Sequence, residues 1–94
     1  VAYPGTSEHQ LGLTVDICSV SNQNLDDSQG DTATQQWLMA NCYKYGFILR
    51  YPSDKSDITG ISYEPWHYRY VGKNVAQEIH DKGICLEEYL EIQQ

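Results

Sequence analysis

Apolar and polar residues alternate along the first clearly patterned segment of the chain. Every second position is apolar in the series Leu13-Thr14-Val15-Asp16-Ile17-Cys18. A period of two is typical of a β-strand with one apolar face. The alternation therefore predicts a strand here, with Asp16 on its second face.

Helical spacing begins after a polar stretch. Residues 19–31 are rich in Ser, Asn, Gln and Asp, which predicts a surface loop. Thr32 and Gln35 then form a capping-box pair, a pattern that begins many helices, and Gly46 is a natural C-terminal stop. The positions that recur at helical spacing between them are Trp37, Leu38, Asn41, Cys42 and Tyr45.

The second half of the chain changes pattern several times. Residues 47–51 predict a strand that ends at Pro52, and residues 53–59 are polar before a turn at Gly60. Residues 61–71 are aromatic and β-prone, which predicts a strand or hairpin interrupted near Pro65. Two short helices should follow, the first closed by Gly83; their apolar positions are Val75, Ala76 and Ile79, then Leu86, Tyr89 and Leu90.

This order of elements favours an α+β fold, with a small antiparallel sheet and flanking helices. Ninety-four residues make one domain, residues 1–94, near the small end of what folds unaided. The chain begins at Val1 without a signal peptide, so we expect a piece of a longer protein.

Composition excludes some classes of function. A net charge of −7 with 6 Lys and Arg argues against nucleic-acid partners and anionic membrane surfaces. No apolar run approaches the roughly 18 residues of a membrane span. The three cysteines, Cys18, Cys42 and Cys85, form no C-x-x-C element, and their apolar segments predict small buried thiols. One disulfide would also be compatible with the sequence.

Candidate metal ligands lie in two separate segments. His9 and Asp16 are followed, far along the chain, by Glu64 and His67. Two imidazoles and one carboxylate make a three-ligand zinc site with a vacant position, and a nearby glutamate can serve as base for a metal-activated water. His9 and Asp16 would stand roughly 23 Å apart on a straight strand, so the chain must fold back between them, which Gly12 permits.

Each of these residues also has an ordinary structural interpretation. His9 alone would be a solvated side chain, Asp16 a hydrogen-bonded strand residue, and Glu64 an exposed charge. Their combination favours the metal site. His80, which lies beside Glu78 and Asp81, is expected to be a solvated helix residue.

Two motifs carry a family resemblance. Residues 7–16 resemble the Ser-x-His-x-x-Gly-x-x-x-Asp element of the VanY-type D-alanyl-D-alanine carboxypeptidases, a family of zinc peptidases. Glu64-Pro65-Trp66-His67 resembles their Glu-x-Trp-His element, and residues 45–52 and 86–90 also match that domain. The resemblance covers nearly the whole chain.

The resemblance implies a function and a site. Zn²⁺ would be bound by His9, Asp16 and His67, with Glu64 as catalytic base. The substrate would be a peptidoglycan stem peptide that loses its C-terminal D-amino acid, in the bacterial cell envelope or outside the cell. The fold would be the one shared with the Hedgehog signalling domain. Two further residues would contact substrate: Ser7 would help bind it, and Trp66 would wall the site unless it is an ordinary core aromatic.

One departure from the family pattern matters. The family carries an N-terminal helical part with an arginine that binds the substrate carboxylate, and this chain lacks it. Arg50 and Arg69 are not in the matching position. We therefore expect a domain truncated at its N-terminus, with apolar sheet surface that could drive formation of a homodimer. The alternative function is a zinc-stabilised binding module for wall peptide or protein, without turnover; Glu64 favours the enzyme, since a structural zinc needs no base.

Overall fold

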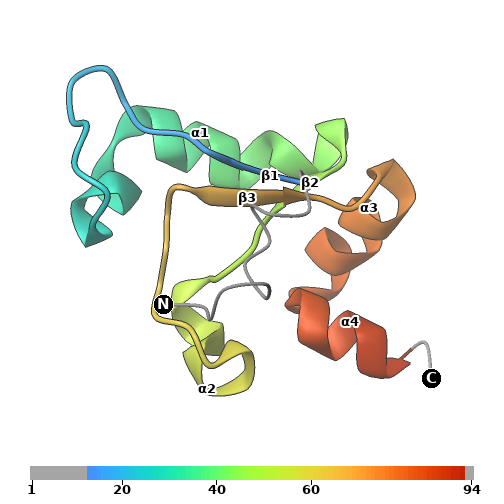
Figure 1. Cartoon of the computed structure of the whole chain (residues 1–94). Coiled ribbons are helices and arrows are strands. Elements are labelled where there is room, and N and C mark those ends of the chain that lie inside the picture. Colours follow the sequence, from blue (N-terminus) through green and yellow to red (C-terminus); the bar gives the residue numbers. More distant parts are fainter. Residues whose placement is uncertain (1–12, 93–94) are drawn as a thin grey trace.

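The computed structural model describes residues 13–92, which form a three-stranded antiparallel sheet surrounded by helices (Figure 1). The strands are β1 (Thr14–Asp16), β2 (Phe47–Leu49) and β3 (His67–Tyr70). The helices are α1 (Ala33–Asn41), α2 (Ser56–Thr59), α3 (Lys73–Lys82) and α4 (Leu86–Ile92), with 3₁₀ turns η2 (Asp27–Asp31), η3 (Cys42–Tyr45) and η4 (Ser53–Lys55). The predicted α+β fold is confirmed. Within these residues, no helix has the length and apolar character needed to cross a lipid bilayer.

The strand latest in the sequence lies in the middle of the sheet. The order is β1-β3-β2, and both outer strands run antiparallel to β3. Figure 1 shows α1 on one side of the sheet, with α2 and α4 on the other. Because cross-strand partners point to the same face, Asp16 and His67 share one face. Their neighbours Val15 and Tyr68 share the other face.

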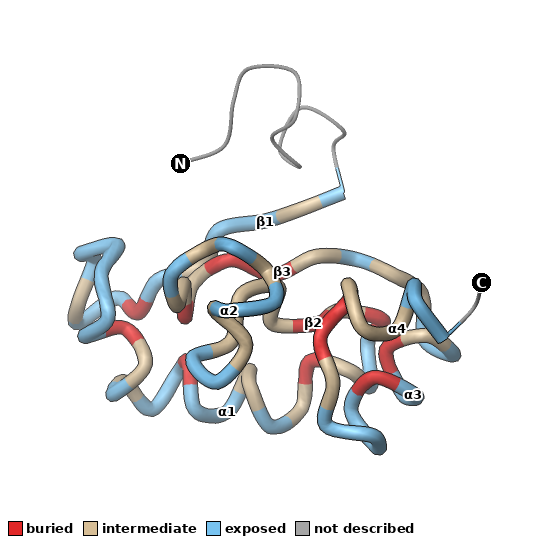
Figure 2. Tube along the Cα trace, turned by 90° about the horizontal axis from the view of Figure 1, so that it is seen from below, coloured by how far each residue is buried: buried red, intermediate tan, exposed pale blue. Residues whose placement is uncertain are grey.

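The main apolar core lies between β2 and the two C-terminal helices. Ile48 packs against Ala76 and Ile79 of α3 and Leu86 of α4. Figure 2 shows buried positions gathered on β2, β3 and the helices, while β1 lies at the edge and is exposed or intermediate throughout. The first strand is therefore held mainly by its pairing with β3.

Helix α1 begins where the capping box predicts. The Thr32 Oγ1 accepts a hydrogen bond from the Gln35 backbone N–H at 3.1 Å. The reciprocal half of the box is not formed, because the Thr32 N–H donates to the Gln29 carbonyl instead. The Gln35 side chain turns inward and is completely buried.

Gly46 ends the helical segment, as predicted. It adopts a left-handed conformation with φ of 87° and is the C-cap residue of η3. A Cβ at this position would stand 2.7 Å from Tyr70 Cε1 on β3. Glycine is therefore required twice here, by the backbone angle and by the close approach of β3.

One prediction of burial is wrong, that of Cys18, and two aromatic residues of the helical pattern are also exposed. Trp37 and Tyr45 recur at helical spacing, but they are 53% and 59% exposed, with ring centroids 6.4 Å apart. Tyr45 lies in the 3₁₀ turn that begins at Cys42, so α-helical spacing no longer applies to it. Trp37 lies within α1, and its exposure depends on how that helix packs against the sheet. Cys18 is exposed because it lies beyond the end of β1, whereas Cys42 and Cys85 are buried as predicted; all three are free thiols.

The predicted strand over residues 61–71 is shorter than expected. The strand is β3 alone, and residues 64–67 form a turn in which the His67 N–H donates to the Glu64 carbonyl at 3.2 Å. Pro65 is buried in that turn, which confirms the predicted interruption. The polar segment 53–59 is also more ordered than its composition indicated, because it forms η4 and α2.

Candidate metal centre

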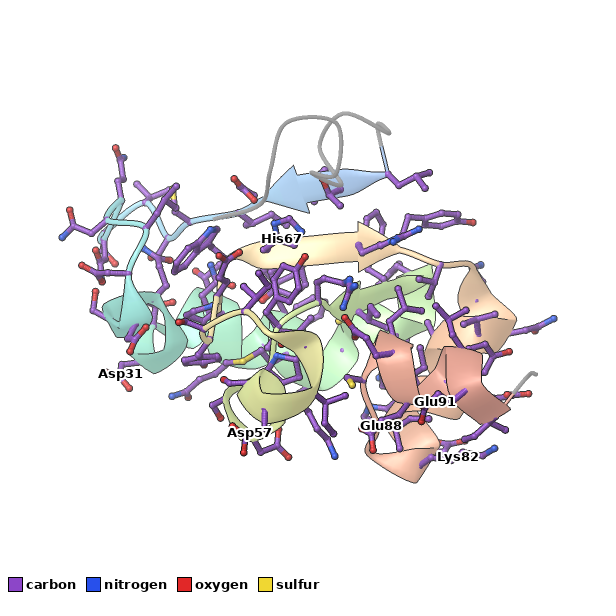
Figure 3. The ribbon with its side chains drawn as sticks, turned by 60° about the horizontal axis from the view of Figure 1, so that its bottom comes forward. Asp31, Asp57, His67, Lys82, Glu88 and Glu91 are labelled. Atoms are coloured by element: carbon purple, nitrogen blue, oxygen red, sulfur yellow. The ribbon has the colours of Figure 1, made fainter. Side chains whose placement is uncertain are left out.

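Asp16 and His67 form the centre of the candidate site. They are direct cross-strand partners in β1 and β3, and Asp16 Oδ1 lies 3.3 Å from His67 Nδ1. Figure 3 shows His67 on β3, facing the region beneath β1. The His67 side chain is 6% exposed and that of Asp16 is 36% exposed. The pair is therefore anchored on the buried strand and open to solvent on the edge strand.

The separation of these two atoms fits zinc. Two ligand atoms each about 2 Å from one tetrahedral zinc stand roughly 3.3 Å apart. Imidazole nitrogen and carboxylate oxygen are both common zinc ligands. The donor atoms and their spacing thus fit two of the three ligands that the sequence predicts. If Nδ1 is the ligand atom, the ring proton of His67 resides on Nε2.

Glu64 reaches the same place from the turn before β3. Its Oε1 lies 3.8 Å from His67 Nδ1, although residues three apart on a regular strand face opposite sides. The turn at Pro65 removes that conflict, and the Glu64 N–H donates to the Tyr51 carbonyl at 3.1 Å. Two carboxylates therefore converge on one imidazole nitrogen, an arrangement that attracts a cation.

The remaining predicted site residues are placed as follows. Ser7 and His9 lie outside the described residues. Within residues 13–92, no three His, Cys, Asp or Glu side chains are arranged as a complete metal site. Trp66 directly precedes His67; it is half-buried, and its carbonyl accepts the Ile17 N–H at 2.8 Å. Its contact with substrate stays a prediction.

The two arginines differ in their surroundings. Arg50 forms an ion pair with Glu87 of α4 at 2.8 Å, and its guanidinium lies 4.7 Å from the Tyr51 ring centroid. Arg50, which directly follows β2, thus connects the end of that strand to α4. Arg69 lies on β3 in register with Thr14 and Ile48, two residues beyond His67 and on the same face.

Sequence reasoning missed two residues near the pair. The Tyr51 ring lies 5.1 Å from the His67 ring, centroid to centroid, at 38°. Gln35 of α1 hydrogen-bonds to the Ile17 carbonyl, directly after Asp16. Tyr51 carries no local motif, and only the pairing of β2 with β3 indicates its position. Gln35 was predicted as a capping-box residue, but its buried side chain depends on tertiary contacts.

Comparison with known proteins shows the family of this chain. The family model described as VanY, D-alanyl-D-alanine carboxypeptidase, matches residues 1–73. The chain belongs to this family. A D-alanyl-D-alanine carboxypeptidase of Enterococcus faecalis is 58% identical over 90 residues, which are 96% of this chain and 32% of that protein.

Three solved structures are similar to this member of the VanY family. The LdcB LD-carboxypeptidase has a TM-score of 0.93 at 58% identity, covering 97% of this chain and 43% of its own. VanYB in complex with D-alanine-D-alanine has a TM-score of 0.87 at 53% identity, covering 100% and 49%. A VanY from a VanB-type resistance cassette, in complex with Zn(II), has a TM-score of 0.81 at 54% identity, covering 96% and 48%. The chain thus spans about a third of the bacterial relative and less than half of each structure.

Proposed function

We propose that this protein is a zinc-dependent carboxypeptidase that removes the terminal D-alanine from peptidoglycan stem peptides ending in D-Ala-D-Ala. The single observation that carries the proposal is the 3.3 Å approach of Asp16 Oδ1 to His67 Nδ1, beside Glu64. Membership of the VanY family and the similar zinc-bound VanY support it. Its place of action would be the cell envelope or outside the cell, where stem peptides are found.

In this proposal the chain supplies the ligands and the base. Asp16 and His67, together with His9, would bind the zinc ion. When bound, zinc lowers the pKa of a water molecule and polarises a carbonyl group, which are the two requirements of amide hydrolysis. Glu64 Oε1 would accept the proton of the attacking water and pass it to the leaving amine.

The burial of the pair suits these roles. His67 is almost entirely buried, so its ring is held in one orientation by the strand and by the Tyr51 ring. Asp16 and Glu64 are partly open to solvent, which leaves a path for peptide and water. Trp66 and Ser7 are proposed to contact the substrate, and the homodimer predicted from the sequence also stays a prediction.

The experiment measures D-alanine released from a stem pentapeptide, with zinc present and after chelation. The protein as naturally encoded should release D-alanine with zinc, and Glu64→Gln should abolish release while keeping the metal. Glu91→Gln, an exposed glutamate of α4, is the matched control and should be fully active. Zinc binding without release would instead support the non-catalytic binding module.

A second peptide distinguishes the two carboxypeptidase classes. A stem tetrapeptide, which ends in a single D-alanine after an L-residue, reports L,D-cleavage. Preferential release from the tetrapeptide would contradict the proposed D,D-specificity, although it would leave the zinc mechanism intact.

A further inference from the structure

Gln35 is a completely buried polar side chain whose amide group is fully used. Its Oε1 accepts the Tyr68 hydroxyl at 2.6 Å, and its Nε2 donates to the Ile17 carbonyl and to Gln29 Oε1, the latter at 3.1 Å. A buried amide must satisfy these groups or lose about 1–3 kcal/mol of stability for each one left unpaired. The side chain is therefore confined to one position.

The partners of Gln35 lie next to the candidate ligands. Ile17 directly follows Asp16, the last residue of β1, and Tyr68 directly follows His67 on β3. One amide thus hydrogen-bonds, from the opposite face of the sheet, to the residue after each ligand. The helix that carries it is itself fixed, because the Gln35 N–H donates to the Thr32 cap.

The hydrogen bonds of Gln35 add to the few contacts that hold β1 in place. Strand β1 is three residues long and lies at the edge of the sheet, with Val15 and Asp16 partly exposed to solvent. The Ile17 N–H donates to the Trp66 carbonyl, which pairs the strands at this end. Gln35 adds the contact that joins the same end of β1 to α1. A shift of β1 by half an ångström would spoil the ligand geometry.

We propose that Gln35 is a positioning residue for the metal centre, which sets the separation of Asp16 and His67 by hydrogen-bonding beside both. The inference rests on the proposed zinc site, and it assigns to α1 a function beyond packing. Loss of a hydrogen bond made directly to a metal ligand commonly weakens metal affinity by about 10–100-fold. Gln35 bonds to the residue after each ligand, so we expect an effect toward the lower end of that range.

The test measures the Co²⁺ dissociation constant and the visible absorption of bound Co²⁺, whose band positions report ligand geometry. It uses the protein as naturally encoded, at a temperature where every variant is folded. Gln35→Met should weaken Co²⁺ binding by roughly tenfold or more and change the spectrum. Tyr68→Phe, which removes one hydroxyl, should change both in the same direction by a smaller factor.

Two controls separate positioning from general stability. Gln36→Met makes the same substitution at the next, exposed position and should alter neither readout. Ile79 belongs to the apolar core on the side of the sheet opposite Gln35. Ile79→Val weakens this core and should lower the melting temperature while leaving the Co²⁺ affinity and spectrum unchanged. If Gln35→Met does not fold, Tyr68→Phe decides the question against the same controls.

Two results would overturn the proposal: unchanged affinity and spectrum in the variants, or an equal loss of affinity in Ile79→Val. These failures differ from failure of the proposed function. A wild-type protein that binds no Co²⁺ would refute the metal site itself. A wild-type protein that binds Co²⁺ and releases no D-alanine would refute the activity and leave the role of Gln35 open to this measurement.

Discussion

Asp16 of β1 and His67 of β3 face each other across the sheet, with Oδ1 and Nδ1 3.3 Å apart. They are 51 positions apart in the sequence (67 minus 16), and antiparallel register alone makes them neighbours. The separation equals that of two ligands on one tetrahedral zinc. The sheet thus acts as the frame of the candidate site.

Replacement of His67 by alanine should abolish zinc binding and the stability that zinc provides. A ligand at about a hundredfold excess over its dissociation constant adds about 2.7 kcal/mol to the free energy of unfolding. For a domain of this size that corresponds to roughly 10–20 °C in melting temperature. Thermal unfolding with and without zinc, together with elemental analysis, measures both effects.

His80→Ala is the matched control for that experiment. His80 stacks on Tyr43 at 3.7 Å between ring centroids, on α3 and away from the candidate ligands. Its replacement can lower the starting melting temperature, but the increase produced by zinc should remain. An unaltered zinc-to-protein ratio in His67→Ala would contradict the ligand assignment.

Cys18→Ser should leave the metal content unchanged. Thiolate is a strong zinc ligand, and Cys18 is two residues from Asp16, which makes it the obvious competing candidate. The structure places it exposed and beyond the end of β1, outside the cross-strand pair. A lower zinc-to-protein ratio by elemental analysis would show that a ligand has been misassigned.

The cysteines should differ sharply in reactivity and in their effect on alkaline stability. Burial raises the pKa of the Cys42 thiol from 9.0 to about 11, and burial also raises the pKa of Cys85. The native state then holds a proton on Cys42 that the unfolded state loses. This contribution to stability is complete below pH 9.0 and declines as the pH rises toward about 11.

Mass spectrometry after brief alkylation at pH 8 measures this difference. Cys18 should be modified rapidly in the folded protein, whereas Cys42 and Cys85 should react only after unfolding. Unfolding in urea at pH 8, 9 and 10 should give decreasing stability, and Cys42→Ala should flatten that trend. Fast modification of Cys42 in the native state would contradict its burial.

Features that depend on neighbours in the sequence were predicted well. Thr32 caps α1, while Gly46 and Gly83 end helical segments in left-handed conformations, because caps and positive φ angles are local requirements. The interruption at Pro65 was predicted for the same reason. The exposure of Trp37 was not, since it depends on where the sheet lies relative to α1.

The sequence by itself determined the start of α1, the glycines that end two helical segments, the α+β class and the residue types of the candidate site, because propensity, capping and donor chemistry belong to the residues themselves. The tertiary structure alone decided that β3 lies between β1 and β2, that Asp16 faces His67, and that Glu64 joins them through a turn. It also decided that Gln35, which the local pattern predicts as a capping residue, is buried and hydrogen-bonds beside both Asp16 and His67. The physical reason is that strand register and burial arise from contacts between distant segments, which no local pattern specifies.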